Sequence, residues 1–260
     1  MICVENENFR LNRILLLAVG LWPYERSLLV RIQFISIFSI LIASVVFQIT
    51  AIWTSEYKID RIIKILSCAL PFALPVIKYI AFMINSCTVK YLLEHLQHIC
   101  NELKDENEIA IMRQYGNDAT LFTTRLLLLA LVSVCFLILL PISPHLLDNI
   151  LPANESRPRF AIPIVTYYFV DQEKYFYLIL LHMIVALCIG IIVLMATGSI
   201  IITYLKHACA MFSIVSYRIQ QAMAIDKLKK TNIGNKSEIC KQIASGVIIH
   251  RTAMELVFIR

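Results

Sequence analysis

Few side chains in this sequence are arranged as they would be in a catalytic or metal site. It contains no glycine-rich phosphate loop, no His-Glu-x-x-His, Cys-x-x-Cys or Gly-x-Ser-x-Gly motif, and no pair of carboxylates in an apolar segment. His95 and His98 lie three residues apart beside Glu94, a spacing that suits a metal, but we interpret them as part of a solvated helix face. The sequence therefore indicates neither an enzyme nor a cofactor or metal site.

Two ionisable side chains lie within long apolar segments. Lys78 is the one basic residue between Ile65 and Val89, and a charge at the centre of a bilayer costs about 2.5–3.5 kcal/mol on insertion scales. We expect its long stem to carry the ammonium group to the membrane surface or to a partner, with a role in gating or ligand sensing as the alternative. We expect His182 to form a hydrogen bond between helices, with a ligand contact as the alternative.

The composition predicts that membrane-spanning helices hold these residues. Hydrophobic residues make up 59% of the chain and charged residues 16%, and the mean hydropathy is +0.73, outside the usual range of soluble proteins. Residues 32–55, 126–147 and 175–205 are uncharged runs, each long enough to cross a hydrocarbon core about 30 Å thick. The run at 175–205 is so long that its helix must tilt or project beyond the bilayer.

A fourth span, residues 65–89, is apolar apart from Lys78. It contains Pro71 and Pro75, which are tolerated in a span when neighbouring helices satisfy the backbone. The apolar residues that follow, between Leu92 and Leu103, recur at helical spacing and predict an amphipathic helix that continues this span beyond the membrane. We therefore predict an all-α, polytopic membrane protein with four transmembrane helices.

The distribution of lysine and arginine favours a cytoplasmic N-terminus. With that orientation, 17 of the 24 basic residues lie in cytoplasmic segments, although their density is similar on the two sides. The sequon at Asn154 then lies in an external loop and is a candidate for glycosylation, whereas the sequon at Asn235 is internal. Neither external loop contains a cysteine, so we expect no external disulfide framework.

The prediction divides the chain into nine consecutive segments. In order, they are a cytoplasmic N-terminal segment (1–31), transmembrane helix 1 (32–55), an external loop (56–64), transmembrane helix 2 (65–89), a cytoplasmic amphipathic helical extension (90–125), transmembrane helix 3 (126–147), an external loop (148–174), transmembrane helix 4 (175–205) and a cytoplasmic helical segment (206–260). Pro141 and Pro144 suit the end of the third helix better than its middle.

Six short stretches along the chain carry a family resemblance. They are Asn12–Leu15, Gly20–Tyr24, Asp171–Phe176, His207–Cys209, Tyr217–Ile219 and His250–Ala253. In this order they resemble the insect odorant receptor family, most closely the receptors of ants, bees and wasps. The resemblance implies seven spans with a cytoplasmic N-terminus, so we expect this sequence to be C-terminally incomplete, with a fifth span beginning where it ends.

The resemblance also implies an odorant pocket in the outer half of the bilayer, among helices two, three, four and six. A volatile odorant is small and mostly apolar, so its site should be an aromatic and aliphatic cavity with few polar groups. The predicted outer parts of the spans offer Phe72, Phe136, Phe176, Ile179 and His182 as ligand contacts. The alternative for each is ordinary packing between helices.

The function that the resemblance implies is that of an odorant receptor subunit. It would bind volatile ligands within the membrane and gate a cation channel together with the family's co-receptor, in the plasma membrane of olfactory sensory neurons. Membrane lipids are the other expected partners, and no nucleic acid is expected. A gustatory-type chemoreceptor of the same architecture and a non-functional truncated receptor are the alternatives.

Overall fold

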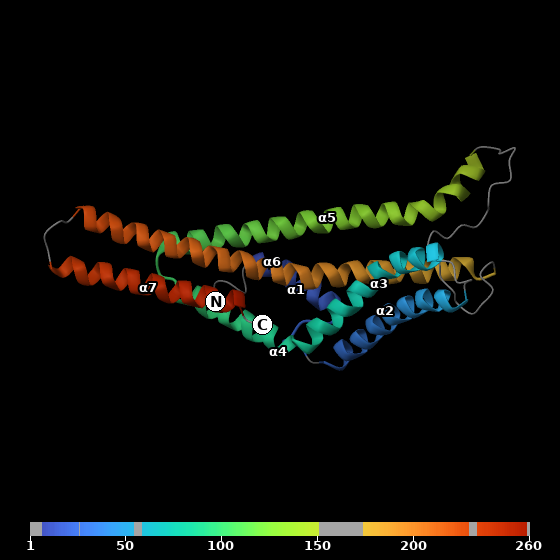
Figure 1. The fold of residues 1–260 in the computed structure, drawn as a ribbon, viewed down its shortest axis with the longest axis horizontal. Helices are drawn as coiled ribbons and strands as arrows, with labels where there is room; N and C mark the ends of the chain where they lie inside the picture. Colours follow the sequence, from blue (N-terminus) through green and yellow to red (C-terminus); the bar gives the residue numbers. More distant parts are fainter. Residues whose placement is uncertain (1–6, 26, 55–58, 151–173, 229–232, 259–260) are drawn as a thin grey trace. The chain divides into compact units, whose positions relative to one another are not determined.

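The computed structural model describes residues 7–25, 27–54, 59–150, 174–228 and 233–258, and these residues are almost entirely helical, with no strand among them (Figure 1). The helices are α1 (Glu7–Ala18), α2 (Leu28–Thr54), α3 (Ile59–Ile84), α4 (Ser86–Glu102), α5 (Glu106–Ile150), α6 (Phe176–Leu228) and α7 (Ile233–Phe258). The predicted all-α fold is therefore confirmed.

Within the described part of the chain, four helices are long and apolar enough to cross a membrane. The candidate spans are Leu28–Ile52, Ile62–Ile84, Glu106–Leu139 and Tyr177–Ala224. Their apolar side chains face outward as well as inward: Ile35 of α2 and Leu129 of α5, for example, are 62% and 63% exposed. A helix that is apolar on every face is typical of a membrane span, where hydrocarbon covers the outer face. The prediction of four spans is confirmed.

The chain forms two compact units. The extension unit comprises Met1–Arg13, Cys87–Thr124 and Gly198–Arg260, and the span unit comprises Ile14–Ser86 and Arg125–Thr197. The helices α5 and α6 contribute to both, because with 45 and 53 residues they are about 68 and 80 Å long, far beyond the roughly 30 Å of a hydrocarbon core. The projection of the fourth span beyond a bilayer thus follows from the length of α6.

The third span also has a long helical extension, although residues 90–125 were predicted to continue the second span. The helix α5 begins at Glu106, within the segment predicted to continue the second span. Asp105 caps it, because its Oδ1 accepts the backbone N–H of Asn107 at 2.9 Å. Glu106 and Glu108 place acidic groups in the first turn, where the helix dipole favours them. A capping signal at Asp105 therefore divides residues 90–125 between α4 and α5.

Four prolines lie inside helices in the structure. Pro71 and Pro75 are within α3, as expected. Pro141 and Pro144 are within α5, which continues past them to Ile150 instead of ending near them. Figure 1 shows that α5 changes direction towards its end, which is the usual effect of proline in a helix.

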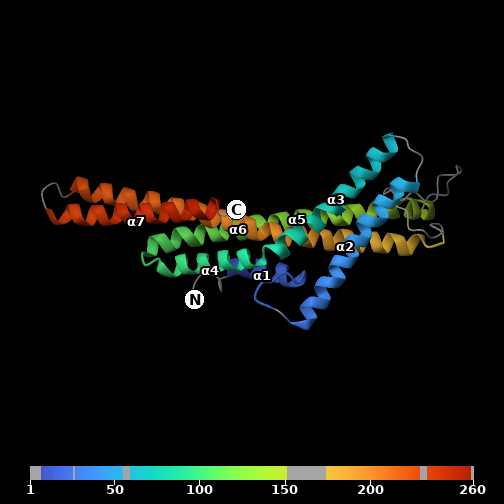
Figure 2. The ribbon, with the colours of Figure 1, turned by 60° about the horizontal axis from the view of Figure 1, so that its bottom comes forward.

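The core of the extension unit joins α4, α5, α6 and α7. Its buried residues are Cys100, Leu103, Met112, Ala210, Met211, Ile214 and Ala253. Figures 1 and 2 both show α7 beside the last part of α6. A methyl group added to Gly246 of α7 would lie 3.9 Å from Val215 of α6, which is ordinary van der Waals contact.

Polar contacts connect the same unit. Asn12, 2% exposed, donates from Nδ2 to Oγ1 of Thr203 at 2.7 Å. The ring of His207 lies 5.6 Å from that of Phe9, and its Nδ1 is 3.1 Å from Sδ of Met112. Asn12 and His207 belong to two of the stretches that carry the family resemblance. These two residues therefore have structural contacts within the extension unit.

In the span unit, hydrogen bonds fix the C-terminal end of α1. Gly20 has φ +68°, and the N–H groups of Gly20 and Leu21 donate to the carbonyls of Leu17 and Leu16, which is a Schellman cap. Gln33 of α2 donates from Nε2 to the carbonyls of Leu17 and Ala18, at 3.1 and 2.8 Å. The C-terminal carbonyls of α1 are thus satisfied by the chain that follows.

Tyr79 completes this arrangement from α3. Its side chain is fully buried, and its hydroxyl donates to the carbonyl of Val19 at 2.8 Å. Its ring stacks on Phe34 of α2, with ring centroids 5.0 Å apart. A single residue of α3 therefore holds both the end of α1 and the first part of α2.

Candidate functional site: a cavity at the start of α6

The first two turns of α6 place one row of side chains on the same face. The N–H groups of Leu178 and Ile179 both donate to the carbonyl of Tyr175 at 3.0 Å, so Tyr175 is the N-cap residue of α6. Helical spacing then aligns Tyr175, Ile179, His182 and Val185 along the helix. These side chains form one wall of a cavity.

The cavity has a volume of about 560 Å³ and is lined by α6 and by Ile40 of α2. Its lining residues are Ile40, Tyr175, Leu178, Ile179, Leu181, His182 and Val185. Only the hydroxyl of Tyr175 and the imidazole of His182 contribute polar side-chain groups. A cavity of several hundred cubic ångströms with apolar walls and a few polar groups is typical of a site for a small apolar molecule.

His182 is held in place by an aromatic contact. Its ring lies 6.1 Å from that of Phe47 of α2, at an interplanar angle of 83°. The edge-to-face arrangement is favourable for aromatic pairs and leaves the imidazole half-buried at the cavity. His182 is therefore oriented by α2 while its ring contributes to the cavity wall.

The structure brings two of the five predicted ligand contacts into this cavity. Ile179, 3% exposed, and His182 line it directly. Phe72 of α3, 4% exposed, packs instead in a buried cluster with Met183 and Ala186 of α6, beside the cavity-lining residues in sequence. Phe72 thus supports the helix that carries the site.

The other predicted residues lie elsewhere. Phe136 of α5 is 66% exposed and does not line the cavity. Phe176 begins α6, but its side chain lies outside the described residues, as does the whole of Asn154. Lys78 of α3 is exposed, next in sequence to the fully buried Tyr79.

Five lining residues were not selected from the sequence. Helical spacing from Ile179 and His182 would have identified Tyr175, Leu178, Leu181 and Val185, because they lie three or four residues away or on the adjoining row. Ile40 had no such signal, since it belongs to the first span, which the resemblance does not place among the pocket helices.

Comparison with known families and structures supports the receptor interpretation. The family model described as "7tm Odorant receptor" matches residues 58–258, more than half of the chain. The chain belongs to this odorant receptor family. The predicted resemblance to odorant receptors is therefore confirmed, and a family of receptors is consistent with the absence of enzyme motifs. No curated protein matches the chain at a significant level.

A solved structure has the same fold as this odorant receptor family member. It is the structure of the insect olfactory receptor OR5 from Machilis hrabei in complex with eugenol, with a TM-score of 0.67 and 17% sequence identity. The match covers 96% of this chain and 63% of the Machilis receptor, so the chain spans less than two thirds of that protein's length. At this identity the likeness establishes the fold alone.

Proposed function

We propose that this member of the odorant receptor family binds a small, mostly apolar volatile in the cavity at the start of α6. The observation that carries the proposal is the composition of the cavity wall, with five aliphatic side chains and the polar groups of Tyr175 and His182. A ligand with one hydrogen-bonding group, such as a hydroxyl or carbonyl, matches this wall. Ile179 supplies apolar contact, and His182 selects the orientation of the polar group.

We further propose that ligand binding gates a cation channel formed with the family's co-receptor, in the plasma membrane of olfactory sensory neurons. The support is family membership together with the resemblance described above. The mechanism is a population shift, in which the ligand favours the open arrangement only to the extent that it binds that arrangement more tightly. The matched family model is that of odorant receptors, which favours this function over a gustatory one.

Two substitutions on α6 test the site. Leu181 and Leu205 are 57% and 50% exposed, but only Leu181 lines the cavity. Leu181→Trp places an indole in the cavity and should abolish the stabilisation of the purified chain by volatiles. Leu205→Trp adds the same side chain outside the cavity and should leave that stabilisation unchanged. The measurement is the thermal midpoint in detergent with and without a panel of volatile alcohols, aldehydes and esters.

The channel proposal needs a separate experiment. The chain is expressed with the co-receptor, surface expression is verified, and cation currents are recorded during exposure to the same panel. We expect currents with the unmodified chain and with Leu205→Trp, and none with Leu181→Trp. Binding without current would contradict the gating proposal alone, whereas equal binding by the two variants would contradict the cavity assignment.

A further inference from the structure

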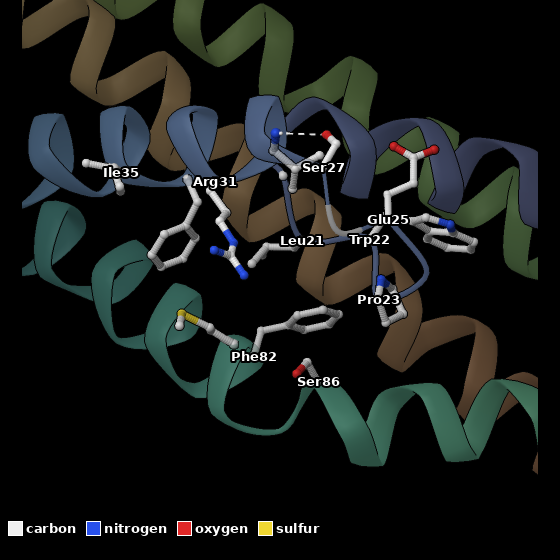
Figure 3. A pocket seen from close by; sticks show the side chains of 13 residues that line it. Leu21, Trp22, Pro23, Glu25, Ser27, Arg31, Ile35, Phe82 and Ser86 are labelled. Carbon is white, nitrogen blue, oxygen red and sulfur yellow. Dashed lines mark hydrogen bonds between the residues drawn. The ribbon is translucent and has the colours of Figure 1, made fainter.

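A second cavity lies in the span unit, beside the C-terminal ends of α1 and α3 and the start of α2. It has a volume of about 510 Å³ (Figure 3). Its lining residues are Gly20, Leu21, Trp22, Pro23, Glu25, Ser27, Val30, Arg31, Phe34, Ile35, Phe82, Met83 and Ser86. The Schellman cap at Gly20 and the contacts of Tyr79 determine the shape of this region. The cavity is therefore bounded by well-anchored elements.

The position of this cavity is that of a membrane boundary. Arg31 lies in the first turn of α2, directly before 24 uncharged residues, and Ser86 lies two residues after the end of the candidate span Ile62–Ile84. Trp22, 9% exposed, contributes the amphipathic ring that is enriched at the level of lipid headgroups. One part of the cavity thus lies at headgroup depth, and Ile35 and Met83 extend it towards the hydrocarbon.

Arg31 supplies the positive charge of this cavity. Figure 3 shows its guanidinium group directed into the cavity, between Leu21 and Phe82. Among the residues that the structure describes, its guanidinium has neither a hydrogen bond nor an ion pair. A planar guanidinium presents paired donors whose geometry matches phosphate. The cavity therefore offers an unused phosphate-binding group beside apolar walls.

Glu25 is the second charged residue of the lining. Figure 3 places it beside Trp22, on the part of the wall formed by the chain between α1 and α2. A headgroup with phosphate alone would bring a second negative charge close to this carboxylate. A headgroup that carries both a phosphate and a primary amine complements both residues, because the ammonium group pairs with Glu25.

We propose that this cavity binds a phosphatidylethanolamine molecule of the membrane leaflet. Its phosphate binds Arg31, its amine faces Glu25, and an acyl chain runs along Ile35, Phe82 and Met83. The proposal goes beyond the odorant site and does not depend on it. The proposed orientation of the chain makes this the cytoplasmic leaflet, and lipid binding itself does not depend on that orientation.

The test measures lipid retained by the purified full chain. The protein is extracted in mild detergent and mixed with phosphatidylethanolamine, phosphatidylcholine or phosphatidylglycerol of identical acyl chains, and bound lipid is counted by native mass spectrometry. We expect phosphatidylethanolamine to be retained most. Arg31→Ala should reduce its apparent affinity about tenfold, the range that a charge-assisted hydrogen bond implies. Arg125→Ala removes the same charge at an exposed position outside the cavity and should retain the lipid.

Two further variants separate lipid binding from folding. Met83→Trp narrows the apolar part of the cavity without changing its charge, and Met223→Trp is its control at an exposed position outside the cavity. We expect only Met83→Trp to lose lipid. Glu25→Gln should remove the preference for phosphatidylethanolamine over phosphatidylglycerol. Equal retention by the unmodified chain, Arg31→Ala and Met83→Trp would overturn the proposal, and a preference for phosphatidylglycerol in the unmodified chain would overturn the choice of headgroup.

Discussion

Arg218 binds two helices at once in the extension unit. Its Nε and Nη2 donate to the two carboxylate oxygens of Glu108 in α5, at 2.5 and 2.7 Å, and its Nη1 donates to Oγ of Ser245 in α7. The side chains of Arg218 and Glu108 are 19% and 5% exposed, so water screens this pair only weakly. The guanidinium group thereby links α5, α6 and α7.

Substitution of either residue of the pair should destabilise the chain. Glu108→Ala leaves a mostly buried guanidinium without its carboxylate, and we expect a loss of about 3–5 kcal/mol in the free energy of unfolding. Arg218→Lys should lose less, because one ammonium group retains the charge but not the bidentate geometry. The readout is the loss of thermal and chemical stability of the purified protein in detergent.

The exposed pair of Lys90 and Glu94 is the control. Its charged groups are 3.8 Å apart and its side chains are 46% and 56% exposed. Glu94→Ala should therefore change the stability by less than about 1 kcal/mol.

The double reversal of Glu108→Arg with Arg218→Glu should recover part of the stability that each reversal loses. A loss at Glu108 no larger than that at Glu94 would contradict this role of the buried pair.

At the scale of the elements, α6 packs tightly against α3 at a glycine. A methyl group on Gly190 would lie 3.1 Å from Cγ of Pro75 and 3.9 Å from Cδ2 of Leu41. Gly190 therefore lies where α2, α3 and α6 meet. Small residues at such points allow helices to pack closely in membranes, where the surrounding lipid is as apolar as the side chains.

Gly190→Ala should destabilise the span unit by about 1–3 kcal/mol, the usual cost of overpacking. The ring of Pro75 is rigid, so relief requires a shift of α3 or α6. Gly198→Ala is a matched control in the same helix, because a methyl group there meets nothing within 4 Å. That substitution should be neutral or stabilise by up to about 1 kcal/mol, since alanine favours helix over glycine. Equal thermal midpoints for the two variants would show that the helices do not meet closely at Gly190.

At the scale of the whole molecule, the direction in which the chain crosses the membrane determines which segments lie in the cytoplasm and which lie outside. The proposed orientation places residues 1–31, 90–125 and 206–260 in the cytoplasm and residues 148–174 outside. The support is the larger number of basic residues in the cytoplasmic segments, with the resemblance to odorant receptors.

Cysteine labelling in whole cells tests this orientation. Cys240 is free and exposed in α7. In a variant that retains Cys240 alone, a membrane-impermeant maleimide should label the protein only after the cells are permeabilised. In a second variant, with Ser156→Cys as the single cysteine, labelling should occur in intact cells. The reverse pattern would establish the opposite orientation.

Residue types and their spacing predict much of this fold, as the helices α4, α5 and α6 illustrate. The uncharged run at 175–205 predicts a membrane helix because charge inside a bilayer is unfavourable. That it belongs to a continuous helix of 53 residues required the structure, since residues beyond a bilayer are free to be polar. Asp105 carried a recognisable capping signal for α5, but the amphipathic residues between Leu92 and Leu103 pointed only to α4.

The sequence by itself determined the helical class, the four spans, the family resemblance and two cavity residues, Ile179 and His182. The helical class and the spans follow from hydropathy and helical spacing, and the two cavity residues follow from the pocket that the family resemblance implies. Only the tertiary structure decided that Ile40 joins the cavity, that Phe72 packs beside it and that Phe136 lies elsewhere. The physical reason is that a membrane helix is apolar on every face, so its sequence does not reveal which face meets another helix and which meets lipid.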